Sequence, residues 1–398
     1  MSPLIPVEEA LHQLLELMPS PSEVEELYLK DAWGRVLAEP VVADVDVPPE
    51  ANSSMDGYAV RVEDLQAVSV LPVSQRVPAG SAPVPLEPGT AARIFTGAPI
   101  PAGANAVIMQ EESVEEGTGV RFTAGVRPLQ NIRPRGQDIQ AGEALLAAGE
   151  LLSAQAMGVL ASAGIERVRV YRRPRVALLS TGDELVQPGQ PLAPGQIYDA
   201  NRFLITGLLQ QAGVVSISTW HAVDTAEATA DVLRKAAADS DLILSSGGVS
   251  VGEEDHVRNQ VEALGALQIW RIKLKPGKPF AAGHVAGTPF IGLPGNPASS
   301  LVTFYLLALP ALRRLQGLRY KPLSGWTLPA GFSRQRPIGR DEFLRVRVEE
   351  GRLVPQGNQS SGVLSNSLKA EGLVRVPADS CVEPGQPLAF LPFSVLSG

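Results

Sequence analysis

Residues 174–318 alternate short apolar runs with amphipathic stretches, and this alternation constrains the fold more than any other feature of the sequence. The runs "RVALLST", "VVSISTW", "DLILSSG", "QIWRIKL" and "TPFIGL" are typical of strands, whereas "ANRFLITGLLQQAG", "AEATADVLRKAAADS", "EEDHVRNQVEALG" and "ASSLVTFYLLALPALRRLQG" have helical periodicity. This order predicts a doubly wound α/β domain with a parallel sheet, which we place at residues 173–320.

The regions on either side of this domain have different patterns. Residues 7–18, "VEEALHQLLELM", have apolar side chains at helical spacing and predict an amphipathic helix. Residues 50–139 consist of short apolar runs separated by turn pairs such as "VPAG", which predicts a β-rich lobe. From residue 321 the chain again has strand character, because apolar and basic residues alternate in "FLRVRVEEG". We therefore expect an α/β multidomain protein.

Composition excludes several classes of protein. The chain has 398 residues, of which 44% are hydrophobic and 19% charged, enough for several buried cores. A net charge of −8 argues against nucleic acid as a partner. The first residues lack a basic segment before an apolar stretch, and no apolar run reaches about 18 residues, so we expect no membrane association and a cytoplasmic location. Cys381 is the single cysteine, and four scattered histidines argue against zinc.

Polar motifs follow the predicted strands at their carboxyl ends, where open α/β sheets bind ligands. "STGDEL" and "YDAN" follow the first strand, and "SSGGVSVGEEDHVRN" continues from the third. Glycines with serine hydroxyls favour an oxyanion, but Glu253, Glu254 and Asp255 would repel it unless a cation lies between them. These motifs predict a phosphate and a divalent metal. Helix capping and turn formation remain the alternative for Asp183 and Asp199.

A basic motif follows in "WRIKLKPGKPF". Its "KPGKP" turn fixes Lys275 and Lys278 near a strand end, where they can neutralise a phosphate or a tetrahedral oxyanion. For Lys273 a solvated edge strand is the simpler interpretation. "GLPGNPASS" adds a glycine turn before a helix that carries Ser299 and Ser300. The motifs together predict a cleft for a large anionic ligand, and the absence of GxxxxGK[ST] and GxGxxG argues against P-loop and dinucleotide-binding proteins.

Seven motifs in this order resemble the MoeA family of molybdopterin molybdenumtransferases, which includes the gephyrin E domain. They are "NSSMDGYAVR", "IFTGAPIPAGANAVIMQEE", "IRPRGQDI", "STGDEL", "SSGGVSVGEED", "KPGKPF" and "GLPGNPASS". The resemblance implies an elongated homodimer of four-domain subunits. It places the domains at 1–49 with 140–172 (mixed), 50–139 (a projecting β-rich lobe), 173–320 (α/β, molybdopterin-binding type) and 321–398 (β-barrel-like).

The resemblance also implies a reaction, in which molybdate is inserted into adenylylated molybdopterin with Mg²⁺ and AMP is released. The predicted cleft suits these substrates, because the ligand carries a phosphate linkage and the lysines and carboxylates supply charge of both signs. Two alternatives stay open. One is a molybdopterin adenylyltransferase, whose fold is similar to the α/β domain, and the other is a non-catalytic scaffold of the gephyrin type. The adenylyltransferase of the pathway is also a candidate protein partner.

The residues that match the family's functional positions fall into three groups. The catalytic group is Asp56, Thr96, Asp138, Glu184, Asp224, Asp255 and Lys275. The group that binds the molybdopterin substrate is Thr181, Gly182, Ser246, Gly247, Gly248, Ser250, Lys275, Lys278, Pro294 and Pro297. The metal and oxyanion group is Glu184 and Asp255 for Mg²⁺, and Lys278, Pro279, Ser299, Arg345 and Ser361 for molybdate.

These positions predict a site shared between subunits. Asp56 and Thr96 belong to the projecting lobe, whereas Glu184, Asp255 and Lys275 belong to the α/β domain. Together with the homodimer that the resemblance implies, this leads us to expect a complete site built from the lobe of one subunit and the α/β domain of the other. Without the resemblance, "MDGY" around Asp56 would be interpreted as a plain turn before a strand.

Overall fold

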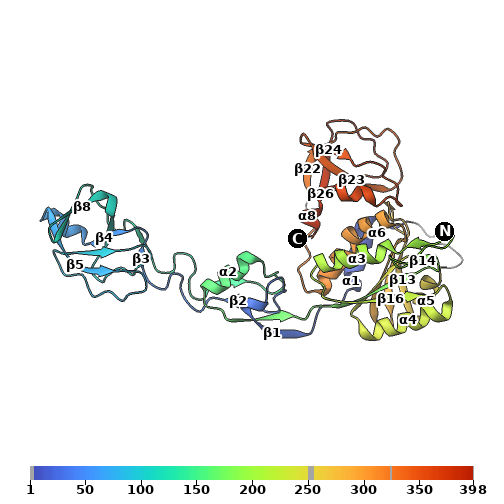
Figure 1. Cartoon of the computed structure of the whole chain (residues 1–398), viewed down its shortest axis with the longest axis horizontal. Coiled ribbons are helices and arrows are strands. Elements are labelled where there is room, and N and C mark those ends of the chain that lie inside the picture. Colours follow the sequence, from blue (N-terminus) through green and yellow to red (C-terminus); the bar gives the residue numbers. More distant parts are fainter. Residues whose placement is uncertain (1–3, 250–254, 323–324, 398) are drawn as a thin grey trace.

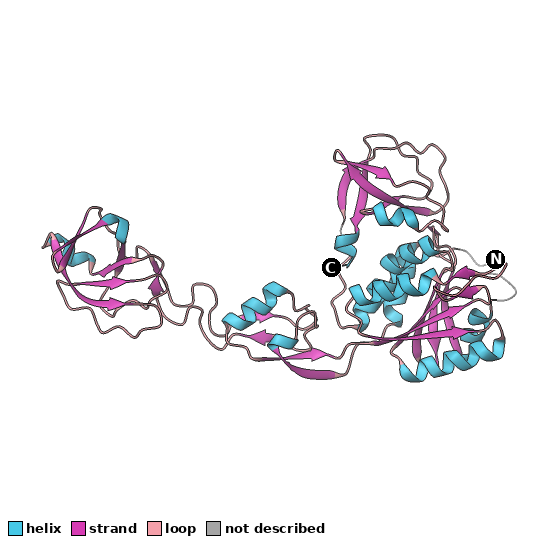
Figure 2. Cartoon of the chain, in the orientation of Figure 1, coloured by secondary structure: helices cyan, strands magenta, loops and turns pink. Residues whose placement is uncertain are grey.

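The computed structural model describes residues 4–249, 255–322 and 325–397 of an elongated chain. Figure 1 shows a β-rich lobe at one end and, at the other, the α/β domain beside the C-terminal sheet, with a small mixed region between the two ends. Helices concentrate on the α/β domain, whereas the lobe consists mainly of strands and loops (Figure 2). The chain runs out to the lobe before residue 50 and returns after residue 139.

The α/β domain contains a six-stranded sheet in the order β16-β13-β17-β21-β20-β18. Its strands are β13 (Arg175–Thr181), β16 (Ser216–Ala222), β17 (Leu242–Ser246), β18 (Gly265–Trp270), β20 (Ala281–Val285) and β21 (Thr288–Leu293). β16, β13, β17 and β21 are parallel, as predicted. β20 pairs antiparallel with both β21 and β18 and so runs against the other five strands, and the prediction of a parallel sheet was wrong for this strand. The cause is the two-residue turn Ala286–Gly287, which joins β20 directly to β21 and permits only antiparallel pairing.

Helices cover both faces of this sheet because side chains alternate along β13. Val176 and Leu178 pack against one group of helices, and Ala177 and Leu179 pack against another. The first group is α1 (Val7–Leu17), α3 (Ala200–Gln211), α6 (Pro297–Thr303) and α7 (Leu309–Leu315), and the second is α4 (Ala226–Asp239) and α5 (His256–Leu264). The domain bounds given above stay a prediction. Helix α1, which they place in the mixed domain, packs in the core of the α/β domain. No helix of the described ranges is long and apolar enough to cross a membrane.

The predicted strand "QIWRIKL" is instead divided between two sheets. β18 ends at Trp270, and Arg271 then adopts a φ of +66°, which interrupts the extended backbone. The next strand, β19 (Leu274–Lys275), pairs with the C-terminal sheet. The last predicted helix is also interrupted, by a π-helical turn at Phe304–Ala308 just before Pro310, which has no N–H to continue the ladder.

The C-terminal sheet runs in the order β19-β23-β25-β26-β22, and β24 pairs with β23. Its strands are β22 (Trp326–Pro329), β23 (Asp341–Glu349), β24 (Arg352–Pro355), β25 (Gly372–Val376) and β26 (Pro387–Pro392), followed by α8 (Phe393–Ser397). Val346 and Val374 belong to its own buried core, while Leu373 and Leu391 join the core of the α/β domain. The two domains therefore share both a strand and a hydrophobic core.

The lobe contains a six-stranded sheet in the order β7-β4-β6-β5-β9-β8, with a β3–β10 pair beside it. Its strands are β3 (Asn52–Ser53), β4 (Gly57–Val60), β5 (Val70–Val77), β6 (Ala91–Ile94), β7 (Ala106–Met109), β8 (Ser113–Glu116), β9 (Gly119–Phe122) and β10 (Ile132–Arg133). The mixed region between the ends contains β1 (Val24–Tyr28), β2 (Val41–Val42), β11 (Ala144–Leu146), α2 (Ala154–Ser162) and β12 (Arg167–Tyr171). Here β1 and β12 form an antiparallel ribbon that leads to the α/β domain (Figure 1).

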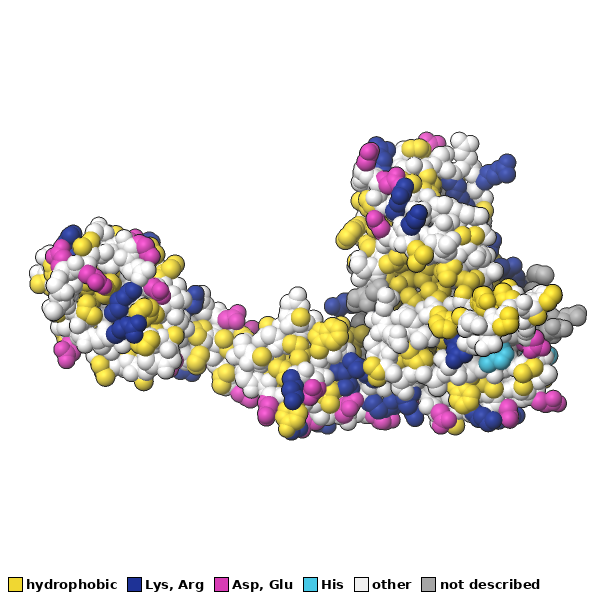
Figure 3. All heavy atoms as spheres, in the orientation of Figure 1, with side chains coloured by type: hydrophobic (Ala, Val, Ile, Leu, Met, Phe, Trp, Pro, Cys, Tyr) yellow, Lys and Arg dark blue, Asp and Glu magenta, His cyan; other side chains and the backbone are white. Residues whose placement is uncertain are grey.

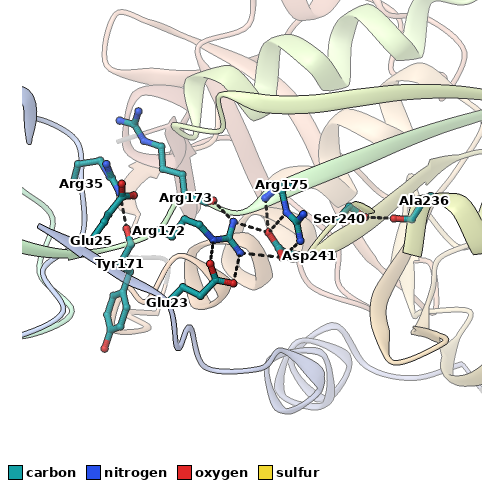
Figure 4. A network of polar contacts seen from close by, with 10 residues as sticks. All are labelled: Glu23, Glu25, Arg35, Tyr171, Arg172, Arg173, Arg175, Ala236, Ser240 and Asp241. Carbon is teal, nitrogen blue, oxygen red and sulfur yellow. Dashed lines mark hydrogen bonds and ion pairs between the residues drawn. The ribbon is translucent and has the colours of Figure 1, made fainter. Parts of the chain in front are cut away.

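An ion-pair network fixes this ribbon to the α/β sheet (Figure 4). Asp241, just before β17, accepts bonds from Arg172 Nη1 at 3.0 Å, Arg175 Nη2 at 3.0 Å and the Arg175 backbone N–H at 2.7 Å. Arg172 also contacts Glu23 at 2.6 Å, before β1. Burial alone would raise the pKa of Asp241, but the hydrogen bonds from Arg175 and Arg172 outweigh it and hold that pKa well below its ordinary value.

Candidate functional site

A cavity of about 560 Å³ lies at the carboxyl ends of β13, β17 and β21. Because these strands are parallel neighbours, the motifs that follow them meet at one edge of the sheet. The predicted residues that line the cavity are Thr181, Gly182, Glu184, Asp224, Ser246, Gly247, Gly248, Asp255, Pro279, Pro294 and Pro297. The structure thus brings together residues from five separate sequence motifs.

A hydrogen-bonded turn forms one side of the cavity. Thr181 Oγ1 donates to Asp224 Oδ1 at 2.7 Å, and the backbone N–H groups of Asp183 and Asp224 each donate to the other residue's carboxylate, at 3.3 and 3.2 Å. Gly182 has a φ of +135°, and a Cβ at this position would clash with the carboxylate of Glu184. Only glycine therefore lets Glu184 fold back over the turn.

The double-glycine turn after β17 forms the floor. Gly247 and Gly248 have φ values of +94° and +69°, and a Cβ on Gly248 would overlap Val257 and Thr181. The Gly247 N–H donates to the carbonyl of Leu293 at 3.0 Å. Both glycines line the cavity, and because neither carries a side chain, their backbone faces a ligand there directly. Glu253, Glu254 and the predicted Ser250 lie outside the described residues.

The lysine motif lies where the α/β and C-terminal domains meet. Lys275 Nζ is 2.8 Å from Glu342 Oε1, and Arg334 Nη2 is 3.0 Å from Glu342 Oε2. Of the predicted residues of this motif, Pro279 lines the cavity, whereas Lys275 and Lys278 are not among its lining residues. Sequence reasoning missed Glu342, because it lies on β23, far from Lys275 along the chain. The available signal was an acidic residue beside the apolar run of "DEFLR", which is unusual for a buried strand.

The C-terminal domain reaches the cavity through the loop that contains Ser361, and the predicted molybdate ligand Arg345 binds the carbonyls of this loop. The Arg345 side chain is 1% exposed and donates to the carbonyls of Val363 at 2.6 Å, Asn358 at 3.1 Å and Ser360 at 3.2 Å. These hydrogen bonds fix the conformation of the loop 358–363. Burial lowers the pKa of the Arg345 guanidinium. The Ser361 carbonyl accepts the Ala298 N–H at 3.0 Å, and the next residue, Gly362, lines the cavity. Ser299, in the first turn of α6, is buried.

The lobe residues lie far from this cavity within one chain. Asp56 lies between β3 and β4, and its Oδ1 accepts both the backbone N–H and the hydroxyl of Thr96 at 2.8 Å each. These bonds lower the pKa of Asp56. Asp138 is exposed on the return from the lobe, where its N–H donates to Val47. β3 and β4 lie at the end of the molecule opposite the α/β domain (Figure 1).

Carboxylates surround the cavity without forming a complete metal site. Glu184, Asp199, Asp224 and Asp255 all line it. In the part of the chain that the structure describes, no three histidine, cysteine or acidic side chains form a metal-binding group. Mg²⁺ often uses one or two carboxylates and takes its remaining ligands from water and substrate phosphates. Glu184 and Asp255 fit that type of site.

Comparisons with known proteins agree with this architecture along the whole chain. Three family models match: the MoeA N-terminal region (domain I and II) at residues 5–164, a probable molybdopterin binding domain at 177–314, and the MoeA C-terminal region (domain IV) at 327–393. A molybdopterin molybdenumtransferase of Haemophilus influenzae is 38% identical over 99% of this chain and 100% of its own length. One of Nostoc is 40% identical over 82% of this chain and 77% of its own.

A solved structure gives the same result. The molybdopterin biosynthesis MoeA protein of Pyrococcus horikoshii OT3 superposes with a TM-score of 0.84 and 30% identity, covering 98% of this chain and 99% of that one. The four-part multidomain fold predicted from the sequence is thereby confirmed. The chain belongs to the molybdopterin molybdenumtransferase (MoeA) family.

Proposed function

We propose that this chain inserts molybdenum into molybdopterin during molybdenum cofactor biosynthesis. The observation that carries the proposal is the 38% identity to a molybdopterin molybdenumtransferase over 99% of the chain. The cavity supports it independently, because about 560 Å³ lies within the range of small-molecule sites. In finer detail, we propose that the substrates are molybdate and adenylylated molybdopterin and that AMP is released.

We assign the roles of the cavity from its chemistry. The glycine turns at Gly182, Gly247 and Gly248 let the phosphate linkage of the substrate approach the backbone. Lys275 and Lys278 lie on the segment that leads to Pro279 at the cavity, and we propose that they supply positive charge for the oxyanion. Arg345 is better suited to positioning the loop that carries Ser361 than to direct contact with molybdate, since its guanidinium donates to three loop carbonyls.

Mg²⁺ would be held by Glu184 and Asp255 together with the substrate phosphates. When bound, it would offset the negative charge that carboxylates and phosphates bring into one cavity. We expect Glu184→Gln and Asp255→Asn to fold normally but to require higher Mg²⁺ for AMP release, each by roughly tenfold. Glu262→Gln, on the exposed side of α5 beside Arg258, is the matched control. An unchanged Mg²⁺ dependence in both site variants would overturn this assignment.

We also propose a homodimer in which the lobe of one subunit completes the cavity of the other. The distance between the Asp56–Thr96 pair and the cavity within one chain supports this (Figure 1). Exposed hydrophobic side chains add support: Trp33 and Phe203 are exposed, and Figure 3 shows hydrophobic side chains gathered where the C-terminal and α/β domains meet. An adenylyltransferase that supplies the substrate remains a proposed partner, and the cytoplasmic location stays a prediction.

The decisive experiment supplies purified protein with adenylylated molybdopterin, molybdate and Mg²⁺ and measures AMP together with reconstitution of a molybdenum-free acceptor enzyme. We expect AMP release and cofactor formation that both depend on molybdate. A second reaction with molybdopterin and MgATP separates the adenylyltransferase alternative, because adenylylated product would appear only in that case. Normal molybdoenzyme activity after deletion of the gene would instead favour a scaffold.

A further inference from the structure

Lys275 is structurally part of the C-terminal sheet, although its sequence belongs to the α/β domain. It lies on β19, which pairs in parallel with β23, and in this register Lys275 lies opposite Glu342. The Asp341 N–H also donates to the carbonyl of Lys273 at 3.1 Å. The backbone position of Lys275 is therefore set by the C-terminal domain.

The side chain of Lys275 is held by the same domain. The Glu342 side chain is only 7% exposed, and both its oxygens are used, one by Lys275 at 2.8 Å and the other by Arg334 at 3.0 Å. The Lys275 side chain is 45% exposed, so its ammonium lies at the edge of the cluster and not inside it. The buried carboxylate of Glu342 thus holds the ammonium group of Lys275, whose side chain remains half exposed.

The charges of this cluster matter as much as its geometry. Lys275 and Arg334 each carry +1 and Glu342 carries −1, so the three groups together keep one net positive charge. A single lysine–glutamate pair would be neutral and would attract an anion weakly. Arg334 satisfies the second oxygen of Glu342, so that the carboxylate can hold Lys275 without cancelling the charge of the whole cluster.

We propose that Glu342 is a positioning residue that aims the ammonium of Lys275 at the incoming oxyanion. This inference rests on the proposed function, because it assumes that Lys275 binds molybdate. The physical reason is entropic: a free lysine loses about 2 kcal/mol of rotamer freedom when a ligand immobilises it, and a lysine already held by a carboxylate loses less. The C-terminal domain therefore tunes the affinity for the oxyanion.

The test compares two substitutions of Glu342, one that removes its negative charge and one that keeps it. Glu342→Gln removes the negative charge and keeps the size, whereas Glu342→Asp keeps the charge and withdraws it by one methylene. If Glu342 positions Lys275, both variants raise the molybdate concentration for half-maximal AMP release, by roughly tenfold, while kcat and pterin binding change little. If only net charge mattered, Glu342→Gln would lower that concentration and Glu342→Asp would leave it unchanged, which would overturn the inference.

Three further variants make the result specific. Glu349→Gln removes a carboxylate that pairs with Arg347 at the far end of β23, and its molybdate dependence should stay that of the parent protein. In a Lys275→Ala background, Glu342→Gln should cause no additional change, because the residue that it positions is gone. Should Glu342→Gln fail to fold, Glu342→Asp keeps the buried charge balance and still decides the question.

Failure of the two proposals can be distinguished. If Lys275→Ala itself leaves the molybdate dependence unchanged, the oxyanion role of Lys275 is wrong, and the inference about Glu342 is overturned with it. If Lys275→Ala raises the half-saturating concentration but neither Glu342 variant does, the proposed function stands and only the positioning role is overturned.

Discussion

The α/β domain and the projecting lobe organise their candidate functional residues differently. In the α/β domain, residues from five motifs line one cavity, because parallel strands end at a common edge. In the lobe, Asp56 and Thr96 bind each other and lie far from that cavity, at the other end of the chain. One region forms a ligand-sized site by itself, whereas the other presents a small hydrogen-bonded pair in which Thr96 is exposed and Asp56 is half-buried.

This difference shows how the two regions would work together. The carboxylate of Asp56 already receives two hydrogen bonds, and its depressed pKa keeps it ionised at neutral pH. Such a group has a fixed charge and a fixed direction, which suits it to meet a ligand held by another surface. An arm that projects the lobe away from its own α/β domain is the geometry expected if that surface belongs to a second subunit.

The strongest test of the comparison is subunit exchange. At a molybdate concentration well below the half-saturating value of Lys275→Ala, Asp56→Ala and Lys275→Ala should each have little activity alone, because each damages both sites of a homodimer. Mixed under exchange, half the dimers become heterodimers in which one site carries both defects and the other none. About a quarter of wild-type activity should therefore return. Mass spectrometry of intact dimers checks that exchange has occurred.

A matched pair provides the control. Asp56→Ala mixed with Thr96→Ala combines two defects of the lobe, so every site in the heterodimer receives one damaged lobe and no activity should return. If the first mixture also recovers nothing although heterodimers are present, each site is completed within one chain. The contrast between the two regions would then disappear.

Much of the α/β fold could be predicted from sequence, because its signals are local. Buried runs such as "TPFIGL" match β21 at both ends, and the glycines of "SSGG" mark the turn that forms the cavity floor. The β18–β19 division could not be predicted. Trp270, Ile272 and Leu274 alternate as one strand would, but the extended backbone is interrupted at Arg271. Ile5, from elsewhere in the sequence, pairs with the next residue, Ile272.

Prediction from the sequence has the same limit for the candidate site. Topology rules bring Thr181, Ser246 and Pro294 together, since they lie at the carboxyl ends of three neighbouring parallel strands. No such rule relates Glu342 to Lys275 or Arg345 to the loop carbonyls, because these contacts cross between domains or close a loop of irregular backbone. Pairing of this kind depends on tertiary packing, which no local pattern encodes.

Arg345 offers a test of how far the cavity depends on its neighbouring domain. Arg345→Met removes the donors for the carbonyls of Asn358, Ser360 and Val363 in a buried setting, so we expect a loss of about 3 kcal/mol in stability. Denaturant unfolding of the whole chain measures this, and proteolysis reports opening of the loop 358–363. The half-saturating molybdate concentration should rise as well, because Gly362 lines the cavity.

Arg347→Met is the control for this prediction. Arg347 lies two residues further along β23, is exposed and pairs only with Glu349 among its described neighbours, so its loss should change stability by no more than about 0.5 kcal/mol. Equal unfolding behaviour of the two variants would contradict the structural role of Arg345. It would also imply that the loop reaches the cavity without that guanidinium.

The smallest expected effect concerns the joint between the two regions, where Asp241 links the ribbon to the sheet. Its depressed pKa means that its stabilisation is fully present above the unfolded-state pKa of about 3.9 and is lost as pH falls through the lower folded-state value. Because Asp241 is partly exposed, we expect Asp241→Asn to cost only about 1 kcal/mol at pH 7. Denaturant unfolding at several pH values measures this cost.

The pH dependence separates a charge effect from a packing effect. If the ion pairs with Arg172 and Arg175 stabilise the joint, the difference between Asp241→Asn and the parent protein should shrink as the pH falls below about 4, because Asp241 then becomes protonated in the unfolded parent protein while it stays ionised in the folded one. Glu23→Gln removes only the exposed partner of Arg172 and should change unfolding less. A constant difference from pH 7 to pH 3 would show that the asparagine disturbs packing and that charge does not hold the lobe-bearing ribbon to the α/β domain.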